Sequence, residues 1–307
     1  MVKINFNQKL FDTHIEEISK KINQKLENIN HNGLSNETIN CLKYLESEIE
    51  NMLKANTNEL ESIINLFKTN YPSSIGVVNQ QEEGWQELYK ILRKEIFEKE
   101  YNLWSDRKKY GAYAFVKELG LETCPYCNRN YTFIVDSDNG KLRAEIDHFY
   151  PKSIYPFLAM SFYNLIPSCS ICNHTKGNTI HQNLENPYDT KEDSYRFTYT
   201  PNSVDFATVE AEKYNFDSFE IDITGNPENI ELFKLEKLYK QHKDIVLELL
   251  IKKAYYPESY VQELSHFGFS QDEIYRYLLG NYKQDEDLHK RPLSKLIRDI
   301  SQELGIV

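Results

Sequence analysis

Two pairs of cysteines constrain this chain more than any other feature of its sequence. Four of its five cysteines form the pairs Cys124-Pro-Tyr-Cys127 and Cys169-Ser-Ile-Cys172. Zinc in structural sites takes four tetrahedral ligands, and two such pairs supply four thiolates. Five cysteines are too few for a disulfide scaffold. The fifth, Cys41, is expected to be an ordinary buried apolar residue.

The spacing of the pairs leaves alternatives to zinc. Each pair alone is also compatible with two coincidentally buried cysteines, and a single CxxC is compatible with a redox motif. A redox site does not require a second pair, so shared zinc ligation is the interpretation that uses all four thiols. The pairs are separated by 41 residues, 128–168, which is more than a compact zinc ribbon contains. A folded element is therefore expected between them.

Composition places the chain among globular proteins. Its 307 residues are 40% hydrophobic and 27% charged, which is enough apolar content for a sizeable core and excludes wholesale disorder. A membrane-spanning helix needs about 18–20 consecutive apolar residues, and no such run occurs. The first residues lack the apolar stretch of a secretory signal. We therefore expect a cytoplasmic protein without a membrane partner.

The net charge is −11, so the chain as a whole does not attract nucleic acid. The segment 124–184 differs, because it holds five basic and four acidic residues. Any function on DNA therefore requires a local positive patch, a metal ion or a partner.

Apolar spacing predicts an α+β protein that is mainly helical, with a small zinc-bearing module at its centre. We expect a helical region over 1–119, the module over 120–190 and a mainly helical region over 191–307. The predicted helices cover 11–26, a segment after the N-cap Ser35, 60–67, 85–119 with a break near Ser105 and Gly120 after it, a segment from Ser170, 229–255, a segment capped by Ser270, and 292–304. The predicted strands cover 131–135, 141–147, 196–200 and 216–224, with a turn at 138–140 and irregular structure at Pro151, Pro156 and Pro167.

An Asp-His pair, Asp147-His148, lies inside the segment between the cysteine pairs. A carboxylate that binds a hard cation and an imidazole that takes a proton from water form a usual set for metal-assisted hydrolysis. Neighbours on a strand face opposite sides, so joint use of both requires the strand to end here, as Pro151 suggests. The dipeptide alone is equally compatible with a surface turn.

Two further elements strengthen the hydrolytic interpretation. Asn164 precedes the second cysteine pair, and Cys172 is followed by Asn173-His174-Thr175-Lys176-Gly177. Together with Asp147-His148, this pattern over 123–178 resembles the HNH family of nucleases, with its ββα-metal fold, in the branch that carries a zinc site of four cysteines.

The resemblance implies a role for each matching position. His148 corresponds to the general base, Asp147 and Asn173 to ligands of a catalytic Mg²⁺ or Mn²⁺, and Asn164 to the residue that braces the loop and orients the histidine. His174 is expected to point elsewhere on the helix, with metal binding as the alternative. The side chains of Lys176 and Arg129 are expected to contact phosphate or to be solvated.

The function expected from this resemblance is metal-dependent endonuclease activity on DNA. The layout is also similar to nuclease subunits of Septu-type anti-phage systems, which implies an ATPase partner in a defence complex. One alternative is a zinc-knuckle subunit that binds nucleic acid or protein without cleavage, and another is a scaffold subunit of a defence complex.

Overall fold

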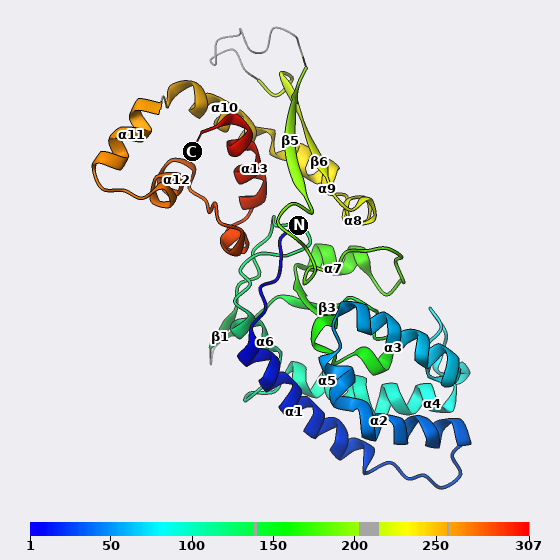
Figure 1. The fold of residues 1–307 in the computed structure, drawn as a ribbon. Helices are drawn as coiled ribbons and strands as arrows, with labels where there is room; N and C mark the ends of the chain where they lie inside the picture. Colours follow the sequence, from blue (N-terminus) through cyan, green and yellow to red (C-terminus); the bar gives the residue numbers. More distant parts are fainter. Residues whose placement is uncertain (138–139, 203–214, 257, 307) are drawn as a thin grey trace. The chain divides into compact units, whose positions relative to one another are not determined.

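Figure 1 shows the chain as a computed structural model, which describes residues 1–137, 140–202, 215–256 and 258–306. The chain forms two compact units, each built from separate stretches of sequence. The first, which we call the ββα unit, contains Asn5–Gly120 and Thr132–His181. The second, which we call the β5/β6 unit, contains Met1–Ile4, Leu121–Tyr131 and Gln182–Val307. The three consecutive regions expected from the sequence remain a prediction.

Three helices open the ββα unit, as the apolar spacing predicted. The side chain of Ser35 accepts a hydrogen bond from the Thr38 amide and caps the second helix. Asn56 and Glu59 form a capping box at the third. The apolar stripes are buried, as at Ile18. The bounds are α1 Gln8–Leu26, α2 Asn36–Lys54 and α3 Thr57–Asn70.

The predicted helix over 85–119 is interrupted near Ser105, as expected, but it also contains a π-helical segment that the sequence pattern did not reveal. Gly120 ends the last helix with φ 69°, a left-handed conformation that glycine adopts without strain. The pieces are α4 Glu87–Lys90, a π-helix over Ile91–Phe97, α5 Glu98–Ser105 and α6 Ala112–Leu119.

The strand expected over 141–147 is in fact two strands in different sheets. β2 (Gly140–Leu142) pairs with β1 (Val135–Ser137), whereas β3 (Glu145–His148) pairs with β4 (Leu165–Ser168), both antiparallel. The single-strand prediction failed because apolar alternation does not show that the pairing partner changes. Of the residues expected to form a strand over 131–135, Val135 is in one, as the first residue of β1. Residues 138 and 139 of the predicted turn lie outside the described residues.

The segment around the prolines is less irregular than expected. Pro156 opens a 3₁₀ turn, Pro156–Leu158, but Pro167 lies within β4, opposite Ile146. The strand tolerates this proline because β4 pairs on one side alone within its two-stranded sheet. A short helix, α7 (Ser170–Lys176), follows β4 where a helix was predicted and packs against β3. β3, β4 and α7 thus form a ββα arrangement.

The β5/β6 unit contains the two strands predicted after Pro187. β5 (Arg196–Pro201) and β6 (Phe219–Thr224) pair antiparallel over their full lengths. The helix predicted over 229–255 is broken, because Lys234 has φ 53° and a 3₁₀ turn follows at Lys240–His242. The helices are α8 Pro227–Leu232, α9 Leu235–Tyr239, α10 Lys243–Tyr255, α11 Glu258–His266, α12 Gln271–Leu279, capped by Ser270 as predicted, and α13 Ser294–Leu304.

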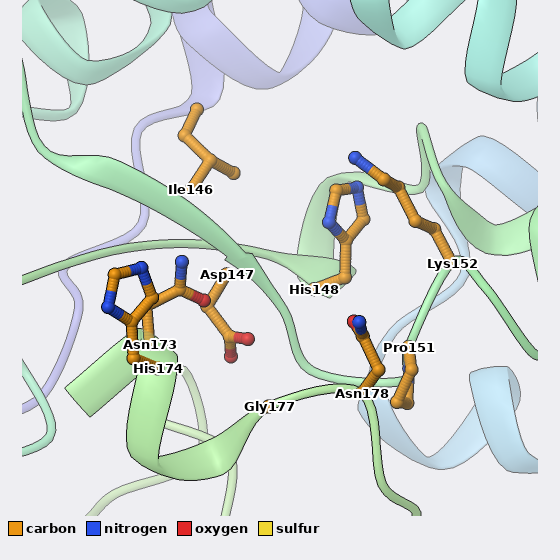
Figure 2. Close-up of a pocket in the computed structure, with 9 residues that line it drawn as sticks. All are labelled: Ile146, Asp147, His148, Pro151, Lys152, Asn173, His174, Gly177 and Asn178. Carbon is orange, nitrogen blue, oxygen red and sulfur yellow. The ribbon is translucent and has the colours of Figure 1, made fainter. Parts of the chain in front are cut away.

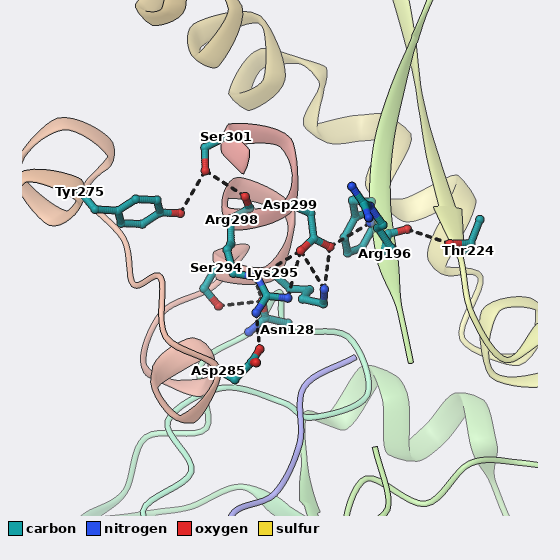
Figure 3. Close-up of polar contacts among 11 residues, drawn as sticks. Asn128, Arg196, Thr224, Tyr275, Asp285, Ser294, Lys295, Arg298, Asp299 and Ser301 are labelled. Atoms are coloured by element: carbon teal, nitrogen blue, oxygen red, sulfur yellow. Dashed lines mark hydrogen bonds and ion pairs between the residues drawn. The ribbon is translucent and has the colours of Figure 1, made fainter. Parts of the chain in front are cut away.

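A buried ionic cluster connects α13 to β5 (Figure 3). Lys295 Nζ lies 2.8 and 2.7 Å from the two carboxylate oxygens of Asp299, and Arg298 pairs with both Asp299 and Asp285. Asp299 also accepts a hydrogen bond from the Phe197 amide at 2.9 Å. Every charge in the cluster has a partner, so it is a structural element of this unit.

None of the helices in the described part of the chain has the length and apolar character that crossing a bilayer requires.

Candidate active site

The end of β3 and the helix α7 line a pocket of about 440 Å³ in the ββα unit (Figure 2). Three residues singled out from the sequence, Asp147, His148 and Asn173, lie along it. Asp147 and His148 are the last two residues of β3, both still paired with β4, and the strand ends directly after them. The other lining residues are Ile146, Pro151, Lys152, His174, Gly177 and Asn178.

His148 is held in one orientation by the backbone. Its Nε2 lies 3.0 Å from the carbonyl oxygen of Ala159. A carbonyl only accepts hydrogen bonds, so Nε2 carries the proton and Nδ1 of the neutral ring is an acceptor. Burial lowers the pKa of His148 well below 6.5, and the charges of Lys152 and Lys176 lower it further, against the hydrogen bond to Ala159. The ring is therefore neutral at pH 7 and able to take up a proton.

Asp147 is paired with a buried lysine. Lys176 Nζ lies 3.1 Å from Asp147 Oδ1 and donates to the carbonyl oxygen of His148 at 2.7 Å. Lys176 is 2% exposed, so the expectation that it is solvated or contacts phosphate is wrong. The lysine comes from the last turn of α7 and fixes this helix to the end of β3. Removing one partner of such a buried pair typically costs about 3–5 kcal/mol.

Asn173 is oriented by Glu145, a residue that sequence reasoning did not single out. Asn173 Nδ2 donates to Glu145 Oε2 at 2.6 Å, which leaves the amide oxygen as the acceptor atom of the side chain. The signal was available, because residues two apart on a strand share a face and Glu145 is two residues before Asp147. His174 also lines the pocket, with Nε2 3.6 Å from the same carboxylate oxygen.

Asn164 does not line the pocket but is fully buried beneath the loop that follows β3. Its Oδ1 accepts from the Tyr150 amide at 2.7 Å, and its Nδ2 donates to the carbonyl oxygens of Tyr150 at 3.1 Å and Leu158 at 2.8 Å. Leu158 precedes Ala159, the acceptor of the His148 hydrogen bond. The side chain thus ties together the two ends of the loop that holds His148.

The four thiols expected to bind zinc lie close together. The sulfur atoms of Cys124, Cys127, Cys169 and Cys172 are all within 4.8 Å of one another. Zinc–sulfur bonds of about 2.3 Å in a tetrahedron place sulfur atoms about 3.8 Å apart, so the cluster fits a zinc ion with little adjustment. A zinc site formed by these four cysteines is thus compatible with the structure.

Two local features shape these cysteine pairs. Asn128, directly after the first pair, has φ 47° and donates its amide to the Cys124 carbonyl oxygen at 2.7 Å, which closes a tight turn. Cys169 is the N-cap residue of α7, whose first turn contains Cys172. The helix that presents Asn173 to the pocket is therefore the helix that carries the second pair.

Arg129 is anchored at one nitrogen, and its expected contact with phosphate stays a prediction. The side chain is half-buried, and its Nε donates to Nε2 of His242 at 2.9 Å. Burial and the neighbouring guanidinium lower the pKa of His242, which keeps the acceptor nitrogen unprotonated.

Comparison with known proteins gives one informative similarity. The chain is 30% identical over 115 residues to the Septu protein PtuB of Bacillus thuringiensis. The matched region covers 38% of this chain and 37% of that protein, so the similarity extends over little more than a third of either. No family model matches the chain. No solved structure matches it at a significant level.

Proposed function

We propose that this protein is a metal-dependent endonuclease of the HNH type that hydrolyses phosphodiester bonds of DNA. The observation that carries the proposal is the meeting of Asp147, His148 and Asn173 at one pocket on a ββα frame. A module that only bound nucleic acid would not need a carboxylate, a neutral imidazole and an amide along one cavity.

In the proposed reaction, Nδ1 of His148 accepts a proton from the water that attacks phosphorus, and the bond to the leaving oxygen breaks. The carboxylate of Asp147 and the amide oxygen of Asn173 are hard donors that suit a divalent cation. The chemistry supplied by a bound Mg²⁺ or Mn²⁺ is stabilisation of negative charge on the phosphate and the leaving oxygen. Asn164 keeps the loop in place so that Ala159 fixes the imidazole.

We further propose that the nuclease acts in defence against phage, beside an ATPase partner. The similarity to a Septu protein supports this proposal. The acidic chain also favours a partner, because its net charge of −11 opposes independent binding to DNA.

Replacement of the proposed base tests the proposal. His148→Ala is expected to lower the rate of plasmid nicking in Mg²⁺ or Mn²⁺ by roughly 10²–10⁴-fold, the usual contribution of a general base. Nicking by the unmodified protein is expected to stop in EDTA. His266→Ala serves as the matched control, because His266 is exposed on α11.

Two results would contradict the proposal. Full activity of the His148→Ala protein would remove the role of that residue. A purified protein that binds DNA but never cuts it, with either metal and with its partner present, would favour the zinc-knuckle binding subunit.

A further inference from the structure

Lys152 lines the pocket but has no role in the reaction proposed above. Figure 2 shows its side chain beside His148, across the pocket from His174. Its Nζ lies 3.8 Å from the centre of the Tyr101 ring. The same ring packs edge-on against the His148 imidazole, with centroids 4.7 Å apart and planes at 65°. One aromatic side chain thus positions both the imidazole and the ammonium group.

No acidic side chain among the described residues contacts the ammonium group of Lys152. Within the described residues it forms neither a hydrogen bond nor an ion pair. Glu98 acts on it only at longer range, and its carboxylate is already bonded to Arg93 Nε at 2.5 Å. Burial is the main cause that lowers the pKa of Lys152. The face of the Tyr101 ring attracts the ammonium group without neutralising its charge.

Charge is unevenly distributed around the pocket. Asp147 is the one carboxylate among the lining residues, and Lys176 already neutralises it at 3.1 Å. The carboxylate of Glu145 lies on the Asn173 side, where it accepts from Asn173 Nδ2 at 2.6 Å. Lys152 therefore makes the His148 side of the pocket positive within a chain of net charge −11. This is a local positive site of the kind that a function on DNA requires.

We propose that Lys152 is the anion-binding residue of this pocket, positioned by Tyr101 to bind a non-bridging oxygen of a phosphodiester on the His148 side. The proposal deepens the proposed nuclease function and rests on it. A lysine ammonium acts as a point charge and suits a phosphate oxygen without a fixed direction of approach. The phosphate would then lie between the Lys152 side and the Asp147–Asn173 side of the pocket.

The test measures binding separately from cleavage. Anisotropy of a labelled DNA duplex in buffer without Mg²⁺, Mn²⁺ or chelator gives the Kd for the full chain, for Lys152→Met and for Lys99→Met. Lys99 is an exposed lysine of α5 outside the pocket, so its replacement removes the same charge without touching the site. Lys152→Met is expected to raise Kd about tenfold and to make the salt dependence less steep by about one phosphate contact. Lys99→Met is expected to change either value less than twofold.

Further measurements separate this proposal from loss of fold and from failure of the nuclease assignment. Lys152→Arg keeps the charge and is expected to restore most of the affinity, while thermal unfolding checks that each variant folds. Should Lys152→Met fail to fold, Lys152→Gln takes its place.

Two outcomes are distinguishable. If the Kd, salt slope and KM of the folded Lys152 variant equal those of the unmodified protein, the role of Lys152 is overturned even if the protein cuts DNA. Absence of cleavage together with the expected change in Kd would overturn the nuclease assignment and leave the anion site standing.

Discussion

Each of the three side chains proposed to act on substrate is held by a neighbour through one polar atom. His148 is held by the Ala159 carbonyl, Asp147 by Lys176, and Asn173 by Glu145. Such supporting contacts restrict the rotamers of reactive groups, and proposed sites without them lose precision. Sequence motifs pointed to the three side chains but not to Lys176 as a partner, because that contact depends on how α7 packs on β3.

A buried histidine near this site gives a pH prediction at the same scale. His14 is fully buried in α1; its Nδ1 lies 2.8 Å from the Tyr110 hydroxyl and its Nε2 2.7 Å from the Met160 carbonyl oxygen. Burial lowers its pKa from 6.5 to about 4, against the hydrogen bond to Met160. The unfolded chain therefore binds a proton that the folded chain excludes between these values.

The sign of the effect follows from this difference in protons bound. The free energy of unfolding does not depend on His14 titration well above pH 6.5 and falls as the pH is lowered toward 4. The total loss over this range is roughly 3 kcal/mol. Between pH 7 and pH 5 the free energy of unfolding is expected to fall by about 2 kcal/mol more in the unmodified protein than in His14→Gln, measured by urea titration. Equal pH dependence of the two proteins would contradict the prediction.

At the scale of elements, the sequence predicted most helices and missed the changes of strand partner. The stripe through Ile15, Ile18 and Ile22 and the cap at Ser35 are local signals, and α1 and α2 follow them. The break between β2 and β3 depends on which strands pair, and the π-helix Ile91–Phe97 depends on the packing around it. Neither leaves a periodic pattern in the chain.

The ββα part of the site was foreseeable for a different reason. Its motif residues are concentrated in 145–176, so β3, β4 and α7 form from nearby segments with little freedom in their order. Lys152 was not foreseen, because its significance comes from Tyr101, a residue of α5 that is distant in sequence. Contacts made between elements distant in sequence are what the sequence alone could not supply.

The helix α7 provides a test of the zinc cluster. Cys169→Ser keeps a good N-cap for α7 but removes one of four thiols, so its effect reports on the metal rather than on helix propensity. We expect less than one zinc per chain by elemental analysis and a lower melting temperature, at roughly 2–4 °C for each kcal/mol lost. A chelator is expected to lower the melting temperature of the unmodified protein and to leave that of the variant nearly unchanged.

Cys41→Ser is the control for this test. Cys41 is fully buried in α2 and lies outside the cluster, so its replacement is expected to cost stability while the zinc content stays at one per chain. Unchanged zinc content in Cys169→Ser would show that the four thiols do not share a metal.

At the scale of the whole molecule, charge separates this protein from enzymes that bind DNA through a broad basic surface. The chain carries 47 acidic residues against 36 basic ones. A net charge of this sign repels the phosphate backbone, so the proposed affinity for DNA would have to come from a few contacts at the pocket or from a partner. This also explains why one lysine, Lys152, is expected to carry a large share of the binding.

The salt dependence of binding tests this interpretation for the complete chain. Each phosphate that a protein neutralises on duplex DNA contributes about −0.9 to the slope of log K against log salt concentration. For the chain alone, without Mg²⁺, Mn²⁺ or chelator and between about 50 and 300 mM NaCl, we expect a slope no steeper than about −2, and a steeper slope once the proposed partner is added. A slope of about −5 or steeper without the partner would reveal a basic surface that the composition opposes, and the need for a partner in DNA binding would then be withdrawn.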